Sequence, residues 1–87
     1  MADIEIYSTA MCPYCVAAKN LLLSKGLPYR ELRIDADANA RREMLARAPG
    51  FRTVPQIFIN GVHVGGFDQL AAADRSGKLQ ELLQATP

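Results

Sequence analysis

Two cysteines three positions apart, with a proline and a tyrosine between them, constrain this chain more than any other feature. The stretch Cys12-Pro13-Tyr14-Cys15 holds both cysteines of the 87 residues. Residues 4–8 alternate between apolar and polar side chains as a strand does, and residues 16–25 carry apolar residues at helical spacing without glycine or proline. The pair is therefore predicted at a strand-to-helix junction, with Cys12 at the N-terminus of the helix.

This position favours a reactive thiol. The free N–H groups and the dipole of a helix N-terminus stabilise a negative charge. We therefore expect the pKa of Cys12 to fall from roughly 8.5 into the range of about 3.5–7.5. A thiolate at Cys12 with a second thiol at Cys15 can close a small disulfide ring and open it again.

A metal site and a purely structural disulfide are the alternative interpretations. Structural zinc takes four ligands, and His63 is the only histidine that could join the two cysteines, besides carboxylates. A disulfide across so short a loop constrains the unfolded chain little. A redox pair is favoured, because a C-x-x-C motif near a β-α-β pattern is typical of cytosolic thiol–disulfide exchange. No metal is expected.

Composition narrows the function class. A formal net charge of +1 gives no general attraction to nucleic acid or to a membrane surface. No apolar run reaches the length of a membrane span, and the N-terminus has no signal-peptide pattern. We expect one domain over residues 1–87, a monomer, in the reducing cytoplasm.

The pattern of elements predicts an α/β fold with the order β-α-β-α-β-β-α-α. A strand–helix–strand unit implies a parallel pair of strands, and Asn60-Gly61 is a strong hairpin signal. The expected architecture is a four-stranded mixed sheet flanked by helices on both faces. The strands are expected at 3–8, 29–34, 56–60 and 62–64, and the helices at 13–25, 39–48, 67–75 and 78–85.

Periodicity also predicts which side chains are buried. In the first strand, Ile4 and Ile6 should face one side and Glu5 and Tyr7 the other. The first helix should bury Val16, Ala17, Leu21, Leu22 and Leu23. The second should turn Met44, Leu45 and Ala48 inward and Arg41, Arg42 and Arg47 outward. These arginines are either a solvated face or an anion site.

A second set of residues suggests a binding site. Thr53-Val54-Pro55 precedes a strand, where proline is tolerated, and the sequence alone favours a trans Val54–Pro55 bond. Gly65-Gly66 is either a strand terminator or a place where a ligand approaches the backbone. The next residues open a helix whose N–H groups could hold a carboxylate. Asp68 is either a helix cap or a partner for a ligand ammonium.

Taken together, Cys12-Pro13-Tyr14-Cys15, Thr53-Val54-Pro55 and Gly65-Gly66-Phe67-Asp68 resemble the dithiol glutaredoxins, in particular the small bacterial glutaredoxin 3 type. The resemblance covers essentially the whole chain. It implies a thioredoxin fold with a cis Val54–Pro55 bond. It also implies glutathione as co-substrate, with Cys12 as nucleophile and Cys15 as resolving thiol.

The resemblance assigns contacts to glutathione as well. Tyr14 would pack on it, Thr53 and Val54 would pair with its backbone, and Pro55 would shape the groove. The γ-glutamyl end would be held by Gly66, Phe67 and Asp68. Arg42 lies where family members often contact the glycyl carboxylate. Partners would then be glutathione and proteins that carry disulfides or are glutathionylated.

Two positions depart from the family pattern. Thr9 stands where a lysine or arginine is common, and Gln69 stands where dithiol members usually have aspartate. We therefore expect glutathione to bind, but more weakly than is typical. Two other functions share these motifs: a thioredoxin-like reductant served by a flavoenzyme, and a carrier of an iron–sulfur cluster ligated by Cys12 and glutathione in two chains. Pro13 makes the second less favoured by resemblance.

Overall fold

The computed structural model of the protein describes residues 2–84, and its element order is the predicted one. Boundaries differ from prediction by at most one residue at each end, which is within the usual uncertainty of element ends. Residue 85, which was predicted to end the last helix, lies outside the described residues. The elements are β1 (Ile4–Ser8), α1 (Pro13–Ser24), β2 (Arg30–Arg33), α2 (Ala38–Arg47), β3 (Gln56–Ile59), β4 (Val62–Gly65), α3 (Phe67–Ser76) and α4 (Lys78–Gln84).

The sheet has four strands in the order β2-β1-β3-β4 and is mixed, as predicted. β1 runs parallel to β2 and antiparallel to β3, and β3 and β4 form the expected hairpin. At the hairpin turn, Asn60 and Gly61 both adopt positive φ, 51° and 82°, the left-handed conformation that an Asn-Gly turn requires.

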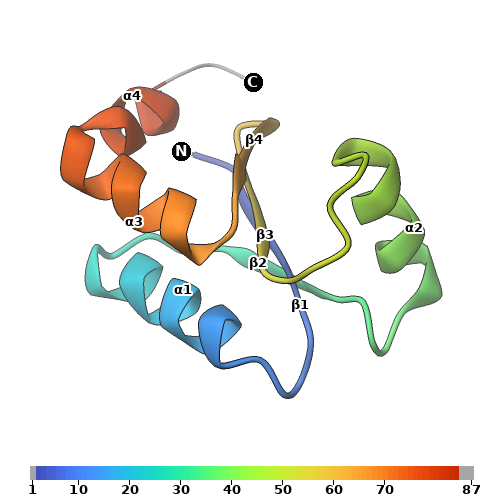
Figure 1. The fold of residues 1–87 in the computed structure, drawn as a ribbon. Helices are drawn as coiled ribbons and strands as arrows, with labels where there is room; N and C mark the ends of the chain where they lie inside the picture. The colour runs from blue at the N-terminus through green and yellow to red at the C-terminus, as the bar shows by residue number, and fades with distance from the viewer. Residues whose placement is uncertain (1, 85–87) are drawn as a thin grey trace.

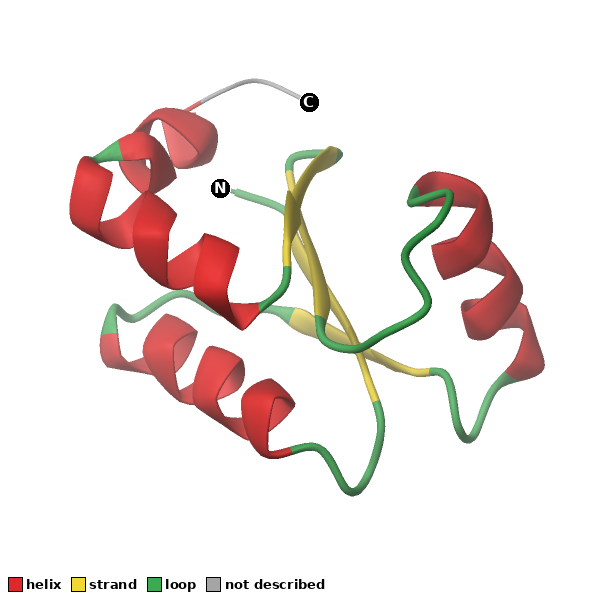
Figure 2. Cartoon of the chain, viewed as in Figure 1, coloured by secondary structure: helices red, strands yellow, loops and turns green. Residues whose placement is uncertain are grey.

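Helices cover both faces of the sheet. Figure 1 shows α1, α3 and α4 on one side and α2 alone on the other, and Figure 2 shows the sheet between them in yellow. Because side chains alternate along a strand, Ile4 and Ile6 join a core with Leu22 of α1. Tyr7 points the other way and packs with Met44 of α2. The predicted alternation along the first strand is confirmed. None of the helices within residues 2–84, the longest of 12 residues, is long and apolar enough to cross a membrane.

The predicted buried face of α1 is partly wrong. Val16 and Leu23 are 49% and 59% exposed, whereas the buried residues are Cys15, Ala18 and Leu22. Apolar residues surround most of this helix, so its sequence alone does not fix which side faces the core. Packing in one core with Ile4 and Ile6 of the sheet and Leu70 of α3 selects the face that includes Ala18 and Leu22.

α2 also differs from prediction at two residues. Leu45 is 36% exposed rather than turned inward. Arg47, predicted to point outward, lies over the sheet with its guanidinium carbon 4.0 Å from the centre of the Phe58 ring. Its two Nη atoms donate to the two carboxylate oxygens of Glu5 at 3.1 and 3.0 Å. Glu5 is only 6% exposed, and a carboxylate buried on this face needs a cation.

His63 packs against the same Phe58 ring as Arg47. Its ring stacks on Phe58 with the centroids 4.9 Å apart, and its Nε2 lies 2.7 Å from Oε1 of Gln56. Burial, and secondarily the charge of Arg47, lower the pKa of His63. The folded state therefore prefers the neutral imidazole.

This lowered pKa predicts a pH-dependent stability. The contribution of His63 is fully present above the unfolded pKa of about 6.5 and is lost as the pH falls through the folded value, because the unfolded chain then binds the extra proton. The free energy of unfolding of the oxidised protein should therefore fall between pH 7.5 and 5.5. His63 is the only histidine, so His63→Phe, which keeps an aromatic ring on Phe58, should give a flat profile. Urea unfolding at each pH measures this. A slope equal to that of wild type in His63→Phe would assign the pH dependence to another group.

Candidate active site

Cys12 lies at the junction between β1 and α1, as predicted. It is the N-cap residue of the helix, and the backbone N–H of Cys15 donates to its Sγ at 3.1 Å. Cys12 and Cys15 form a disulfide. Cys12 is half-buried, whereas Cys15 is completely buried. A substrate can therefore reach one sulfur of the pair, and that sulfur is the one at the helix N-terminus, where a thiolate is stabilised.

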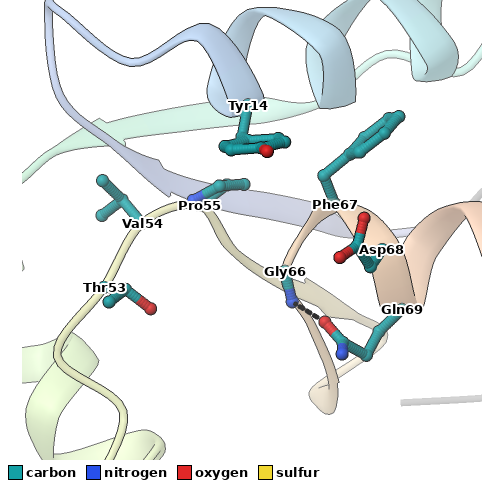
Figure 3. Close-up of a pocket in the computed structure, with 8 residues that line it drawn as sticks. All are labelled: Tyr14, Thr53, Val54, Pro55, Gly66, Phe67, Asp68 and Gln69. Carbon is teal, nitrogen blue, oxygen red and sulfur yellow. Dashed lines mark hydrogen bonds between the residues drawn. The ribbon is translucent and has the colours of Figure 1, made fainter.

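A groove of about 370 Å³ lies next to the start of α1, and Figure 3 shows the side chains that line it. It connects three segments that are far apart in the sequence: the start of α1, the segment before β3 and the start of α3. The rings of Tyr14 and Phe67 are tilted by 32° with their centroids 6.4 Å apart. The lining residues are Tyr14, Thr53, Val54, Pro55, Gly66, Phe67, Asp68 and Gln69. The structure thus brings together every predicted binding residue except Arg42.

The segment before β3 forms the side of the groove next to the cysteines. The carbonyl oxygen of Val54 lies 3.8 Å from the Sγ of Cys12. The Val54–Pro55 bond is cis. The cis bond that the family resemblance implies is therefore confirmed, and the trans bond favoured by the sequence alone is wrong. The side chain of Gln56 donates to the carbonyl oxygen of Thr53 at 3.0 Å, which ties this segment to the first residue of β3.

The start of α3 forms the far end of the groove. Gly66, not Asp68, is the N-cap residue, and its N–H donates to Oε1 of Gln69 at 2.9 Å (Figure 3). The side-chain oxygen of Gln69 is therefore already engaged, which leaves Asp68 as the anionic group of the lining. Gly65 has a φ of +120°, and a Cβ there would come within 2.9 Å of Cγ of Gln69. Both facts require glycine at this position.

Arg42 lies outside the groove lining, and its guanidinium donates to the side-chain oxygen of Asn39. Two other arginines, Arg41 and Arg52, line a separate pocket of about 340 Å³ with Leu45 and Gly50. Sequence reasoning missed Arg52 as a candidate. The available signal was its position directly before Thr53, a groove residue.

Comparison with known proteins identifies the family. The glutaredoxin family model matches residues 4–64. The chain is 52% identical to glutaredoxin 3 of Escherichia coli K12 over 97% of this chain and all of the relative, and 51% identical to a glutaredoxin of Pseudomonas aeruginosa over 98% of this chain and all of the relative. The chain belongs to the glutaredoxin family.

Solved glutaredoxins agree with this assignment. The solution structure of a glutaredoxin from Brucella melitensis is 48% identical, with a TM-score of 0.81 over 97% of this chain and 90% of that chain. A crystal structure of a buckwheat glutaredoxin–glutathione complex is 33% identical, with a TM-score of 0.82 over 94% of this chain and 76% of that chain. The predicted fold and redox function are confirmed: the protein is a glutaredoxin, a thiol–disulfide oxidoreductase, with the redox pair Cys12 and Cys15.

Proposed function

We propose that glutathione binds in the groove between Tyr14, Val54 and Phe67 and exchanges disulfides with Cys12 there. The observation that carries this is the position of Val54, which lines the groove and also places its carbonyl oxygen 3.8 Å from the Sγ of Cys12. A peptide lying along the groove would therefore bring its own sulfur to the reactive one. The buckwheat relative was solved as a complex with glutathione, which supports glutathione as the ligand.

The chemistry of the lining gives each part of glutathione a partner. The backbone of Thr53 and Val54, which line the groove, pairs with the central peptide of an extended ligand. At the other end, the N–H groups of Phe67 and Asp68, in the first turn of α3, have no partner within the helix and can hold the γ-glutamyl carboxylate. The carboxylate of Asp68 takes the γ-glutamyl ammonium.

For the glycyl carboxylate, the pocket beside Arg52 replaces Arg42 as our proposed partner. Arg52 directly precedes Thr53, and Arg41 shares its pocket. Neither guanidinium has a salt-bridge partner within residues 2–84, so both are available to an external carboxylate. Arginine suits this role, because its planar fork matches a carboxylate.

Reduction of a glutathionylated protein needs Cys12 alone. Its thiolate attacks the glutathione sulfur of the mixed disulfide, so that the substrate leaves as a thiolate and Cys12 becomes glutathionylated. A second glutathione thiolate attacks the sulfur of the bound glutathione. Glutathione disulfide is released and the Cys12 thiolate is regenerated.

Reduction of a protein disulfide uses both cysteines. The Cys12 thiolate attacks one sulfur of the substrate and forms a mixed disulfide with it. Cys15 then attacks the Cys12 sulfur, which releases the substrate as a dithiol and leaves the Cys12–Cys15 disulfide. Two glutathione molecules reduce that disulfide in turn and leave as glutathione disulfide.

We further infer that residues 1–87 act as one glutaredoxin domain, as a monomer in the cytoplasm. The protein partners are disulfide-containing or glutathionylated proteins. The apolar side chains next to the disulfide support this, since Met11 is 92% exposed and Tyr14 63% exposed. Exposed apolar side chains beside a reactive sulfur offer a protein substrate a contact surface.

Asp68 provides the test of this binding mode. Asp68→Asn removes the anionic partner of the γ-glutamyl ammonium, and a charge-assisted hydrogen bond is roughly twice as strong as a neutral one. We expect the apparent KM for glutathione to rise roughly fivefold, the size of a partly solvated charge contact. The measurement is the glutathione-coupled reduction of a small mixed disulfide.

Asp74→Asn is the matched control, because Asp74 lies on the same helix but pairs with Lys25 outside the groove. It should leave the KM for glutathione unchanged. An unchanged KM in Asp68→Asn, or an equal rise in both variants, would contradict the proposed orientation of glutathione.

A further inference from the structure

The loop between β1 and α1, which precedes Cys12, is exposed. Ala10 and Met11 are both exposed, while Ser8, at the end of β1, is completely buried. The Oγ of Ser8 donates to Glu31 at 2.5 Å, and Glu31 also pairs with Lys19 of α1 at 2.9 Å. The strand end before the loop is therefore fixed, and the position of the loop depends on contacts beyond it.

Asp35, which follows β2, supplies such a contact. The backbone N–H of Ala10 donates to its Oδ2 at 3.0 Å. Arg33 holds the same carboxylate with two parallel hydrogen bonds, Nε to Oδ1 at 2.7 Å and Nη2 to Oδ2 at 2.8 Å. Arg33 is the β2 partner of Ser8 in the sheet register, so this pair is anchored where the loop begins. Ala10, whose N–H Asp35 holds, lies only two residues before Cys12.

The carboxylate of Asp35 accepts these hydrogen bonds in its ionised form. The hydrogen bonds from Arg33 first, and from the Ala10 N–H second, hold the pKa of Asp35 well below its usual range. The group therefore stays ionised wherever the enzyme works. Arg33 also neutralises much of its charge, which leaves the geometry of the Ala10 bond as its main effect on the loop.

We propose that Asp35 is a positioning residue for the active-site loop, fixing the Ala10 backbone so that Cys12 is held facing the groove. Attack on a bound disulfide requires the sulfur atoms to be aligned, and a small displacement of the nucleophile slows it strongly. The inference rests on the proposed action of Cys12 at the groove. It adds Asp35, which touches neither substrate nor sulfur, to the residues that set the rate.

Three variants test this role. Asp35→Ala removes the acceptor and should lower kcat for the glutathione-coupled reduction of a small mixed disulfide about fivefold, a fraction of the loss that a 1 Å misplacement can cause. Asp35→Asn keeps an oxygen for the Ala10 N–H without the charge, and should retain a kcat close to that of wild type. Asp37→Ala is the matched control, because Asp37 accepts from the Asn39 N–H at 2.8 Å at the start of α2, away from the loop.

The pH dependence of Cys12 alkylation separates position from charge. If Asp35 acts through its geometry, the profile of Asp35→Asn should match wild type, and kcat should be lost only in Asp35→Ala. Equal loss of kcat in Asp35→Asn, equal loss in Asp37→Ala, or a wild-type kcat in Asp35→Ala would each overturn the proposal. An inactive wild-type protein would instead overturn the proposed function itself.

Discussion

Cys12→Ser should reduce both activities to the uncatalysed background, whereas Cys15→Ser should lose only one of them. Cys12 is the sulfur that a substrate can reach, and the N–H of Cys15 stabilises its thiolate. Removing a nucleophile typically costs a factor on the order of a thousand or more. Cys15 is completely buried and acts after the first attack, so Cys15→Ser should still reduce a glutathione mixed disulfide but not a protein disulfide.

Two assays with the same three proteins measure this: glutathione-coupled reduction of a small mixed disulfide, and glutathione-coupled reduction of a protein disulfide. Serine is close in size to cysteine, so neither variant should unfold, which a thermal melt can check. A Cys15→Ser protein that is inactive in both assays would show that the route through Cys12 alone does not operate.

Among single substitutions of charged side chains that are partly exposed, Arg47→Met should cause the largest loss of stability. It leaves Glu5 buried with only the exposed Arg30 at 2.9 Å, and removes the donor to the Tyr7 hydroxyl, 2.9 Å from Nη1 of Arg47. Removing one partner of a buried pair costs about 3 kcal/mol or more, and the remaining contact to Arg30 should reduce this to about 2–3 kcal/mol. Urea unfolding of the oxidised protein at pH 7 measures the change.

Two further proteins sharpen this measurement. Arg30→Met removes a side chain that is 61% exposed from the same carboxylate, so it should cost less than about 1 kcal/mol. The double variant Glu5→Gln, Arg47→Met removes the uncompensated charge and should be more stable than Arg47→Met alone. A cost for Arg47→Met no larger than that for Arg30→Met would show that the buried pair contributes little.

The parts of the structure that depend on short-range pattern were predictable. The alternation of Ile4 to Tyr7, the hairpin at Asn60-Gly61 and the strand-to-helix position of Cys12 each follow from neighbours in the sequence, and the structure confirms them. The groove was predictable for a different reason. Its residues come from three distant segments, and the family resemblance, not the local pattern, brought them together.

The wrong predictions concern side chains whose exposure depends on residues that are distant in the sequence. Arg47 looks solvent-exposed within its own helix, but Glu5, 42 positions earlier, turns it over the sheet. Leu23 looks buried because α1 is apolar on several sides, yet the packing of the helix selects another face. Arg42 lies outside the groove lining, whereas Arg41 lines the neighbouring pocket, because a helix turns by about 100° per residue and adjacent side chains face different surfaces.

The capping of α3 by its own side chain has a consequence for turnover. Because the Gly66 N–H is occupied by Gln69, the helix start has one donor fewer for an incoming anion. In the mechanism proposed above, each cycle ends when a second glutathione attacks the sulfur of the glutathione bound to Cys12, and the two leave as the oxidised dimer, which is twice the size of the reduced form. Under the proposed binding mode, a looser hold at this end shortens the residence time of that product. With this cap at α3, the protein binds glutathione less tightly but exchanges glutathione disulfide for the next glutathione molecule faster.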